Sequence, residues 1–223
     1  MFKHLLLVSL SLFPLVSQAG AALTEMETRW LQAAAPVLAY SQTVKLPIDI
    51  VVQPVAGPND VPMAMGFKDG RCKLVLSMRG NPDAEKVLEQ VPAEQRTMVM
   101  EAMAAHEVGH CWRYAQGNWH ALPAGFEEND NPAEVQQILQ NQREEGYADL
   151  VALAWTRRQH PANYGQLHGW LSALRGGEQT VAGGSHDTRA WIRLAQDGKV
   201  FAASATPFDE AMGAWSAGLV ADD

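Results

Sequence analysis

Two histidines and a glutamate have the types and the spacing of a metal site in the segment His106-Glu107-Val108-Gly109-His110. An α-helix turns through about 100° per residue, so side chains four residues apart lie on one face. His106 and His110 can therefore direct their imidazole nitrogens at one point, with Glu107 beside it. Two imidazoles at this spacing are typical of a zinc site, and a carboxylate at their flank can take a proton from a metal-activated water.

The segment around this motif has the apolar spacing of a buried helix. Val99 and Met103 lead along one stripe into the two histidines, and a second apolar line runs through Met100, Ala104, Val108 and Cys111. An imidazole on a buried stripe needs a polar partner. The pattern therefore favours metal binding over a solvent-facing helix with two incidental histidines.

A catalytic zinc needs a third protein ligand and one open position. Some zinc sites take this ligand from a third histidine six residues after the second one. This chain does not, because Gln116 stands at that position. Glu145 and Asp149 are four residues apart on a later predicted helix, so a carboxylate ligand is followed one turn on by a second carboxylate. The second can accept an N–H from a zinc-bound histidine. There are two alternatives. Glu144 could be the ligand instead of Glu145, or Glu145 and Asp149 could simply form a solvated face of the helix.

The two segments together, H-E-V-G-H and E-G-Y-A-D, resemble the gluzincin zinc metallopeptidases. The Glu-x-x-Ala-Asp form is similar to that of the group containing the CAAX-processing peptidases and their bacterial heat-shock relatives. The resemblance covers mainly residues 93–157, and the membrane spans of that group are lacking, so it does not identify the substrate. It implies Zn²⁺ as cofactor, a peptide or protein substrate, and His106, His110 and Glu145 as metal ligands.

The resemblance also implies roles for residues around the metal. Glu107 would be the general base that takes a proton from a zinc-activated water during peptide-bond hydrolysis, and Asp149 the hydrogen-bond partner of His106. A group must also stabilise the developing oxyanion. His186 is the first choice, because the family carries a His-Pro element with a downstream arginine at a similar distance, although Asp187 replaces the proline here. The alternatives are Tyr147, Tyr114 and His120.

A second interpretation is a catalytically inactive periplasmic zinc-binding or regulatory module. The intact Glu107 argues against it, because a purely structural site has no use for that carboxylate. Structural zinc sites also tend to have four ligands, many of them cysteines. A scaffold protein without a metal is a third, weaker interpretation.

The N-terminus has the features of a secretory signal peptide at residues 1–21. An apolar run at 5–16 follows a positive charge, and cleavage is expected after Ala19 or Ala21. The run is short for a membrane span, so we expect no stable membrane insertion after cleavage, with an uncleaved anchor as the alternative. The mature chain, residues 22–223, is expected to be a single domain in the periplasm or the medium.

Composition narrows the range of partners. The 223 residues are 47% hydrophobic and 19% charged, with a net charge of −8. This is ordinary globular composition, and no cluster of Lys and Arg stands out. An acidic chain of this kind is not expected to bind nucleic acid or anionic membranes.

The chain has two cysteines, Cys72 and Cys111, an even number that suits an oxidising compartment. A disulfide between them would fix the end of the motif helix to an upstream segment. In the chain-entropy model it would stabilise the fold by roughly 3–4 kcal/mol. Two buried free thiols are the alternative.

These elements predict an α+β, zincin-like fold: a small twisted sheet packed on the motif helix, with a helix-rich C-terminal part. Helices are expected at 24–40, 82–90, 92–116, 132–159, 161–175, 187–196 and 207–219, strands at 48–52 and 72–77, and loops at 57–70. The strand at 72–77 would be the sheet edge, where an extended peptide could add and lie across the zinc. Six of the seven tryptophans are expected in the core, and Trp119 in the wall of a cleft.

Overall fold

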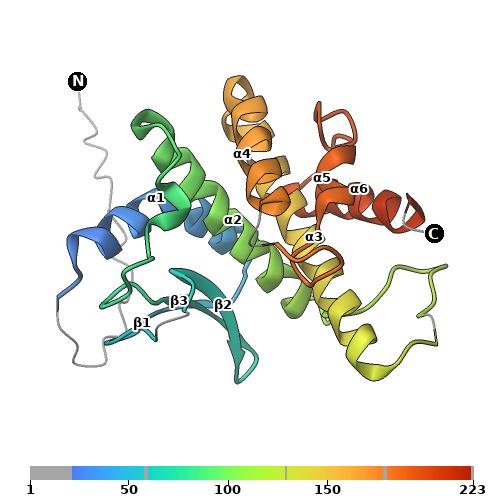
Figure 1. Cartoon of the computed structure of the whole chain (residues 1–223), viewed down its shortest axis with the longest axis horizontal. Helices are drawn as coiled ribbons and strands as arrows, with labels where there is room; N and C mark the ends of the chain where they lie inside the picture. The colour runs from blue at the N-terminus through green and yellow to red at the C-terminus, as the bar shows by residue number, and fades with distance from the viewer. Residues whose placement is uncertain (1–21, 58–59, 129, 178–179, 222–223) are drawn as a thin grey trace, which may run out of the picture.

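The computed structural model describes residues 22–57, 60–128, 130–177 and 180–221. The expected signal peptide, residues 1–21, lies outside the described residues. The described part has an α+β architecture with one small mixed sheet (Figure 1). No described helix combines the length and the apolar character needed to cross a membrane.

The helices are α1 (Glu25–Thr43), α2 (Arg96–Ala115), α3 (Ala133–Gln159), α4 (Tyr164–Gly176), α5 (Arg189–Leu194) and α6 (Pro207–Ala221). The strands are β1 (Ile48–Val52), β2 (Met63–Lys68) and β3 (Arg71–Leu76). Short 3-10 turns occupy Lys86–Leu88, Ala93–Gln95 and Pro161–Asn163. The motif segment lies in α2 and the second carboxylate segment in α3, as the spacing predicted.

The sheet differs from the prediction in one strand and in its order. Residues 57–70, expected as loops, contain β2, because the glycines and prolines there obscure a short apolar run. The strand order is β1-β3-β2, with β1 parallel and β2 antiparallel to β3. The strand predicted at 72–77 is therefore central, and the prediction that it forms the edge is wrong. β2 is an edge strand, and it lies against α2.

The helix predicted at 82–90 is also wrong, since only one 3-10 turn forms there. Asn81, which directly precedes this segment, holds a turn. Its side-chain oxygen accepts the backbone N–H of Asp83, and its amide donates to the carbonyl groups of Ser77 and Asp60. Asparagine side chains commonly compete with helix formation in this way.

Helix α2 lies between the sheet on one side and the C-terminal helices on the other (Figure 1). It approaches α3 closely at Gly109, where a Cβ atom would be 3.2 Å from the Cα atom of Ala148. Four tryptophans are buried in the core: Trp30, Trp155, Trp191 and Trp215. The other two that were expected there, Trp112 and Trp170, are partly buried and pack against it.

The predicted disulfide between Cys72 and Cys111 is confirmed. It joins the central strand β3 to α2 at the residue after His110, and both cysteines are fully buried. The bond therefore ties the sheet to the turn of α2 that carries the second histidine.

We expect the double variant Cys72→Ser, Cys111→Ser to lose roughly 2–5 kcal/mol of unfolding free energy, because the unfolded chain regains the entropy that the cross-link removes. Urea unfolding under oxidising conditions measures this loss. The same unfolding curve for the wild-type chain under reducing conditions is the control. A variant as stable as the oxidised wild type would contradict the expectation.

Candidate metal centre

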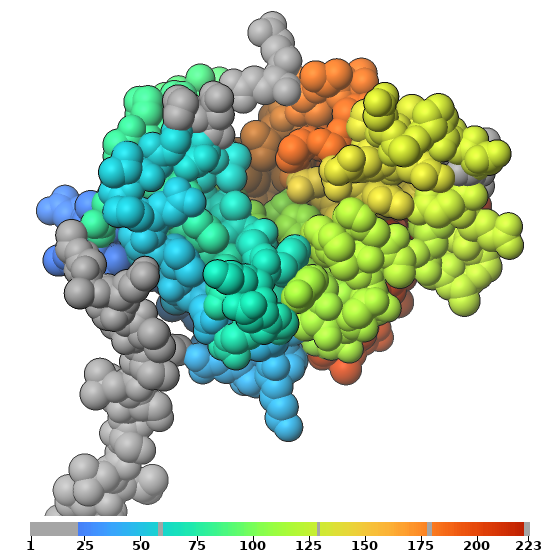
Figure 2. Space-filling model, turned by 90° about the horizontal axis from the view of Figure 1, so that it is seen from below, coloured from blue at the N-terminus to red at the C-terminus, as the bar shows by residue number. Residues whose placement is uncertain are grey.

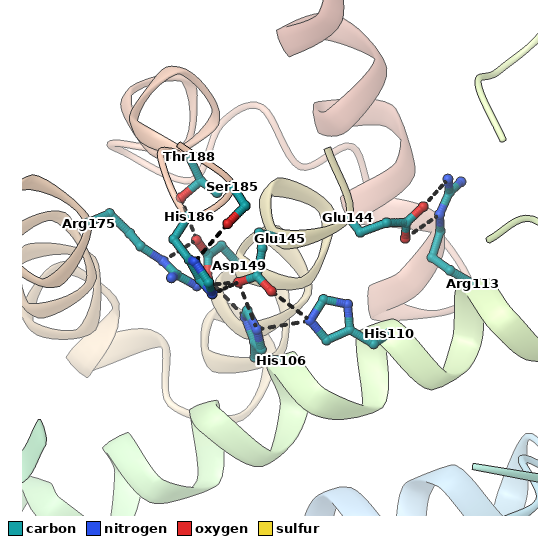
Figure 3. A network of polar contacts seen from close by, with 10 residues as sticks. All are labelled: His106, His110, Arg113, Glu144, Glu145, Asp149, Arg175, Ser185, His186 and Thr188. Atoms are coloured by element: carbon teal, nitrogen blue, oxygen red, sulfur yellow. Dashed lines mark hydrogen bonds and ion pairs between the residues drawn. The ribbon is translucent and has the colours of Figure 1, made fainter. Parts of the chain in front are cut away.

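Three side chains converge between α2 and α3 (Figure 3). The Nε2 atoms of His106 and His110 lie 3.1 Å apart. The two carboxylate oxygens of Glu145 lie 3.5 Å from them, Oε2 from His106 and Oε1 from His110. These three residues form a group that could hold a metal ion.

The donor atoms have the spacing that a metal ion requires. Four tetrahedral ligands at about 2.1 Å from a zinc ion lie roughly 3.4 Å from one another, close to the distances found here. The Nδ1 atom of His106 lies 2.9 Å from Oδ1 of Asp149. An ionised carboxylate only accepts hydrogen bonds, so Nδ1 carries the proton and Nε2 presents a lone pair to the site. The residues therefore fit a divalent metal ion.

Electrostatics favour a positive charge at this point. Burial lowers the pKa of His106, but the hydrogen bond to Asp149 and the charge of Glu145 outweigh it and raise the pKa. Burial raises the pKa of Glu145, but His110, His106 and Arg175 together hold it well below its ordinary value. The Glu145 carboxylate is therefore ionised and available to a cation.

Asp149 is fully buried, so the alternative of a solvated carboxylate face is wrong. Besides its contact with His106, it accepts two hydrogen bonds from Arg175, of 2.9 and 2.8 Å, and one of 2.6 Å from the hydroxyl of Thr188. Burial raises its pKa, but Arg175 and His106 outweigh this effect and lower the pKa to about 2. Asp149 is therefore an ionised acceptor that fixes the orientation of the His106 ring.

Arg175 on α4 belongs to the site, and the sequence reasoning missed it. Its Nη2 atom also donates to Oε2 of Glu145, at 2.9 Å, so one guanidinium holds both Glu145 and Asp149. Leu167, Leu171 and Arg175 are four residues apart and are all buried. An arginine at the end of an apolar helical stripe is expected to be buried with a partner, and this pattern could have identified Arg175 from the sequence.

We expect Arg175→Met to weaken metal affinity by about 10- to 100-fold, because Glu145 and Asp149 lose the donor that orients them. Competition with a chromophoric chelator measures the affinity. The control is Arg189→Met, which removes an exposed arginine paired with Asp187. Equal affinities in the two variants would show that Arg175 does not position the ligands.

Glu107 lies beside the three converging residues and is not one of them. The pKa of its carboxyl group is raised, and burial is the largest cause. The charge of Glu145 also raises this pKa, whereas the two histidines and a hydrogen bond from the backbone N–H of Met65 lower it by less. Met65 is in β2, so the edge of the sheet contacts this carboxylate. Glu107 therefore interacts with all three residues of the group, and its role as the general base stays a prediction.

His186 lies on the loop between α4 and α5, and its ring lies beside the carboxylate of Glu145 (Figure 3). Its Nε2 atom is 3.9 Å from Oε2 of Glu145, and 61% of its side chain is exposed. An open cavity of about 310 Å³ borders it and is lined by Arg175, Val181 and His186, among others. The structure thus brings His186 to the rim of the site, and its role as an oxyanion stabiliser stays a prediction.

Two of the other candidates, Tyr147 and Glu144, point away from the site. Tyr147 is fully buried, and its hydroxyl donates to the carbonyl of Phe208, so it does not reach the site. Glu144 forms a buried ion pair with Arg113 and does not face the histidines (Figure 3). Tyr114 and His120 take part in ring contacts with Phe67 and Trp119, respectively.

Comparison with models of protein families, with curated proteins and with solved structures found no match. The assignment of the site therefore depends on the geometry of this chain. That geometry defines an α+β protein with a candidate metal centre of two histidines and one glutamate.

Proposed function

We propose that this chain is an exported, zinc-dependent metallopeptidase that hydrolyses peptide bonds. The observation that carries the proposal is the convergence of His106, His110 and Glu145, with the carboxylate of Glu107 beside them. The small sheet packed on α2 and the helix-rich C-terminal part support the zincin-like fold that the resemblance implies.

The ligand set favours a catalytic zinc over a structural one. Two histidines and one glutamate leave a coordination position open, whereas structural sites are closed and often rich in cysteine. Both cysteines of this chain form the disulfide and offer no thiolate. The disulfide also supports export to an oxidising compartment such as the periplasm or the medium.

The chemistry that a bound zinc supplies is activation of water and polarisation of a carbonyl group. Glu107 accepts the proton of the attacking water and passes it to the leaving amine. The N–H of Met65 holds the Glu107 carboxylate, and Asp149 with Arg175 holds the ligands. His186 donates an N–H to the carbonyl oxygen as negative charge develops there.

A peptide substrate has a place beside this centre. β2 is an edge strand, and its residue Met65 contacts Glu107. An extended peptide can add to a strand edge through backbone hydrogen bonds. Figure 2 shows a hollow between the sheet side, coloured cyan to teal, and the yellow-to-orange helices and loops. We therefore place the substrate along β2, in place of the strand at 72–77 that the sequence favoured.

The test is elemental analysis of the purified mature chain, followed by a peptide-library cleavage assay. We expect one zinc ion per chain, and cleavage that a chelator abolishes and added zinc restores. A chain that binds no metal would rule out the proposal. Zinc without cleavage of any peptide would instead favour the catalytically inactive zinc-binding module.

A further inference from the structure

Three aromatic rings form a continuous surface beside the metal centre, here named the aromatic wall: Phe67, Tyr114 and Trp119. The ring of Phe67 stacks on Tyr114 at a centroid distance of 4.1 Å and meets Trp119 edge-on at 4.8 Å. All three side chains are only partly buried. The wall therefore keeps some aromatic surface accessible.

The aromatic wall adjoins the proposed catalytic groups at two points. Trp119 meets the ring of the ligand His110 edge-on, with the centroids 5.7 Å apart. Phe67 follows Met65 by two residues in the edge strand β2, and residues two apart in a strand point the same way. Because β2 lies against α2, the helix that carries His106 and His110, a peptide lying along β2 would pass from the metal centre directly to the wall.

The loop that carries Trp119 is held in one conformation by a buried ion pair. Arg113 and Glu144 are almost fully buried and lie 2.9 Å apart. Glu144 accepts the backbone N–H of His120 at 2.8 Å, and Arg113 donates to the carbonyl of Ala121 at 2.7 Å.

His120 itself has a φ of 62°, in the left-handed region that a residue other than glycine rarely adopts. Such a conformation persists only where its surroundings fix it, and these positions are found preferentially at binding sites. A buried ion pair is weak evidence for stability. Here its visible effect is to fix the backbone next to Trp119, whose indole lies against the ring of His110.

We propose that the aromatic wall is a substrate subsite that selects peptides with an aromatic or large aliphatic side chain close to the bond that is cleaved. Rigid rings offer a large contact area at a low cost in conformational entropy. The three rings carry no charge that could pair with a charged substrate side chain, which would lose its hydration there. This inference rests on the proposed peptidase function and names the substrate class.

The test compares cleavage by wild-type and Trp119→Ala chains of peptides in which one residue near the cleaved bond is Phe, Leu, Ala or Asp. The wild-type chain should prefer Phe and Leu. Trp119→Ala should lose roughly 10- to 100-fold in kcat/KM for those peptides and little for the Ala peptide. Trp170→Ala is the matched control. Trp170 lies on α4, and its indole N–H donates to the carbonyl of Val87, which is not part of the site. This variant should keep the preference.

Zinc content and thermal unfolding show whether Trp119→Ala keeps its fold. If it does not, Phe67→Leu provides the same test from the strand side. A wild-type chain that cleaves all four peptides equally well, or a folded Trp119→Ala chain that keeps the preference, would overturn the inference and leave the peptidase function standing.

Failure of the peptidase function gives a different result. In that case the wild-type chain cleaves none of the peptides. The second measurement is then calorimetry of the binding of the same four peptides to the zinc-loaded Glu107→Gln chain. The subsite would still be supported if the Phe and Leu peptides bind more tightly than the others and the Trp119→Ala substitution abolishes this difference. Equal binding of all four would overturn it.

Discussion

Glu107→Gln should lower kcat by roughly 10²- to 10⁴-fold and leave the zinc content unchanged. The amide keeps the shape of the side chain but cannot take a proton from the attacking water. The three ligand atoms of His106, His110 and Glu145 are not altered by this change. The measurement is kcat for the best peptide of the library, with elemental analysis of the same sample.

The matched control is Glu94→Gln, an exposed carboxylate just before the start of α2. It should behave as the wild type in both measurements. Full turnover by the Glu107→Gln chain would show that this carboxylate is not the general base. Loss of zinc would show that it holds the metal instead of acting beside it.

His106→Ala should weaken zinc affinity by roughly 10²- to 10³-fold and abolish cleavage with it. Structural zinc in a four-ligand site is bound by about 10–16 kcal/mol, so one ligand of four contributes on the order of 3 kcal/mol. The variant also leaves Asp149 without the imidazole that it contacts. Competition with a chromophoric chelator gives the affinity.

A histidine outside the site provides the comparison. His168→Ala removes an imidazole on α4 whose Nε2 atom contacts the carbonyl of Ile192. It should bind zinc as tightly as the wild-type chain. Addition of zinc should raise the thermal unfolding midpoint of the wild-type and His168→Ala chains, because a ligand bound only by the folded state stabilises it. An equal increase for the His106→Ala chain would contradict the assigned ligand set.

The sequence predicted the parts of the site that depend on spacing within one helix. His106 and His110 share a face because they are four residues apart, and the same holds for Glu145 and Asp149. The cysteine pairing could also be predicted, because two cysteines allow only one intramolecular bridge. The sequence did not predict β2, because Gly66 and the prolines before it obscure a short apolar run, and the sheet edge was misplaced as a result.

Contacts between separate elements could not be predicted. Arg175 reaches Asp149 and Glu145 from another helix, and its sequence neighbours give no partner. The pairing of Glu144 with Arg113 likewise depends on how α2 lies against α3. The four-residue spacing to Asp149 favoured Glu145 over the adjacent Glu144 as the ligand, but only the packing of α3 against α2 brings the Glu145 carboxylate to the histidines.

The sequence by itself therefore determined the residue types of the candidate metal centre and their order on two helices, because the helical repeat is a property of the local backbone. The tertiary structure decided which carboxylate meets the histidines, which arginine holds it, and which strand edge lies beside Glu107. These contacts join residues far apart in the chain, and the packing of α2 against α3 and the sheet brings them together.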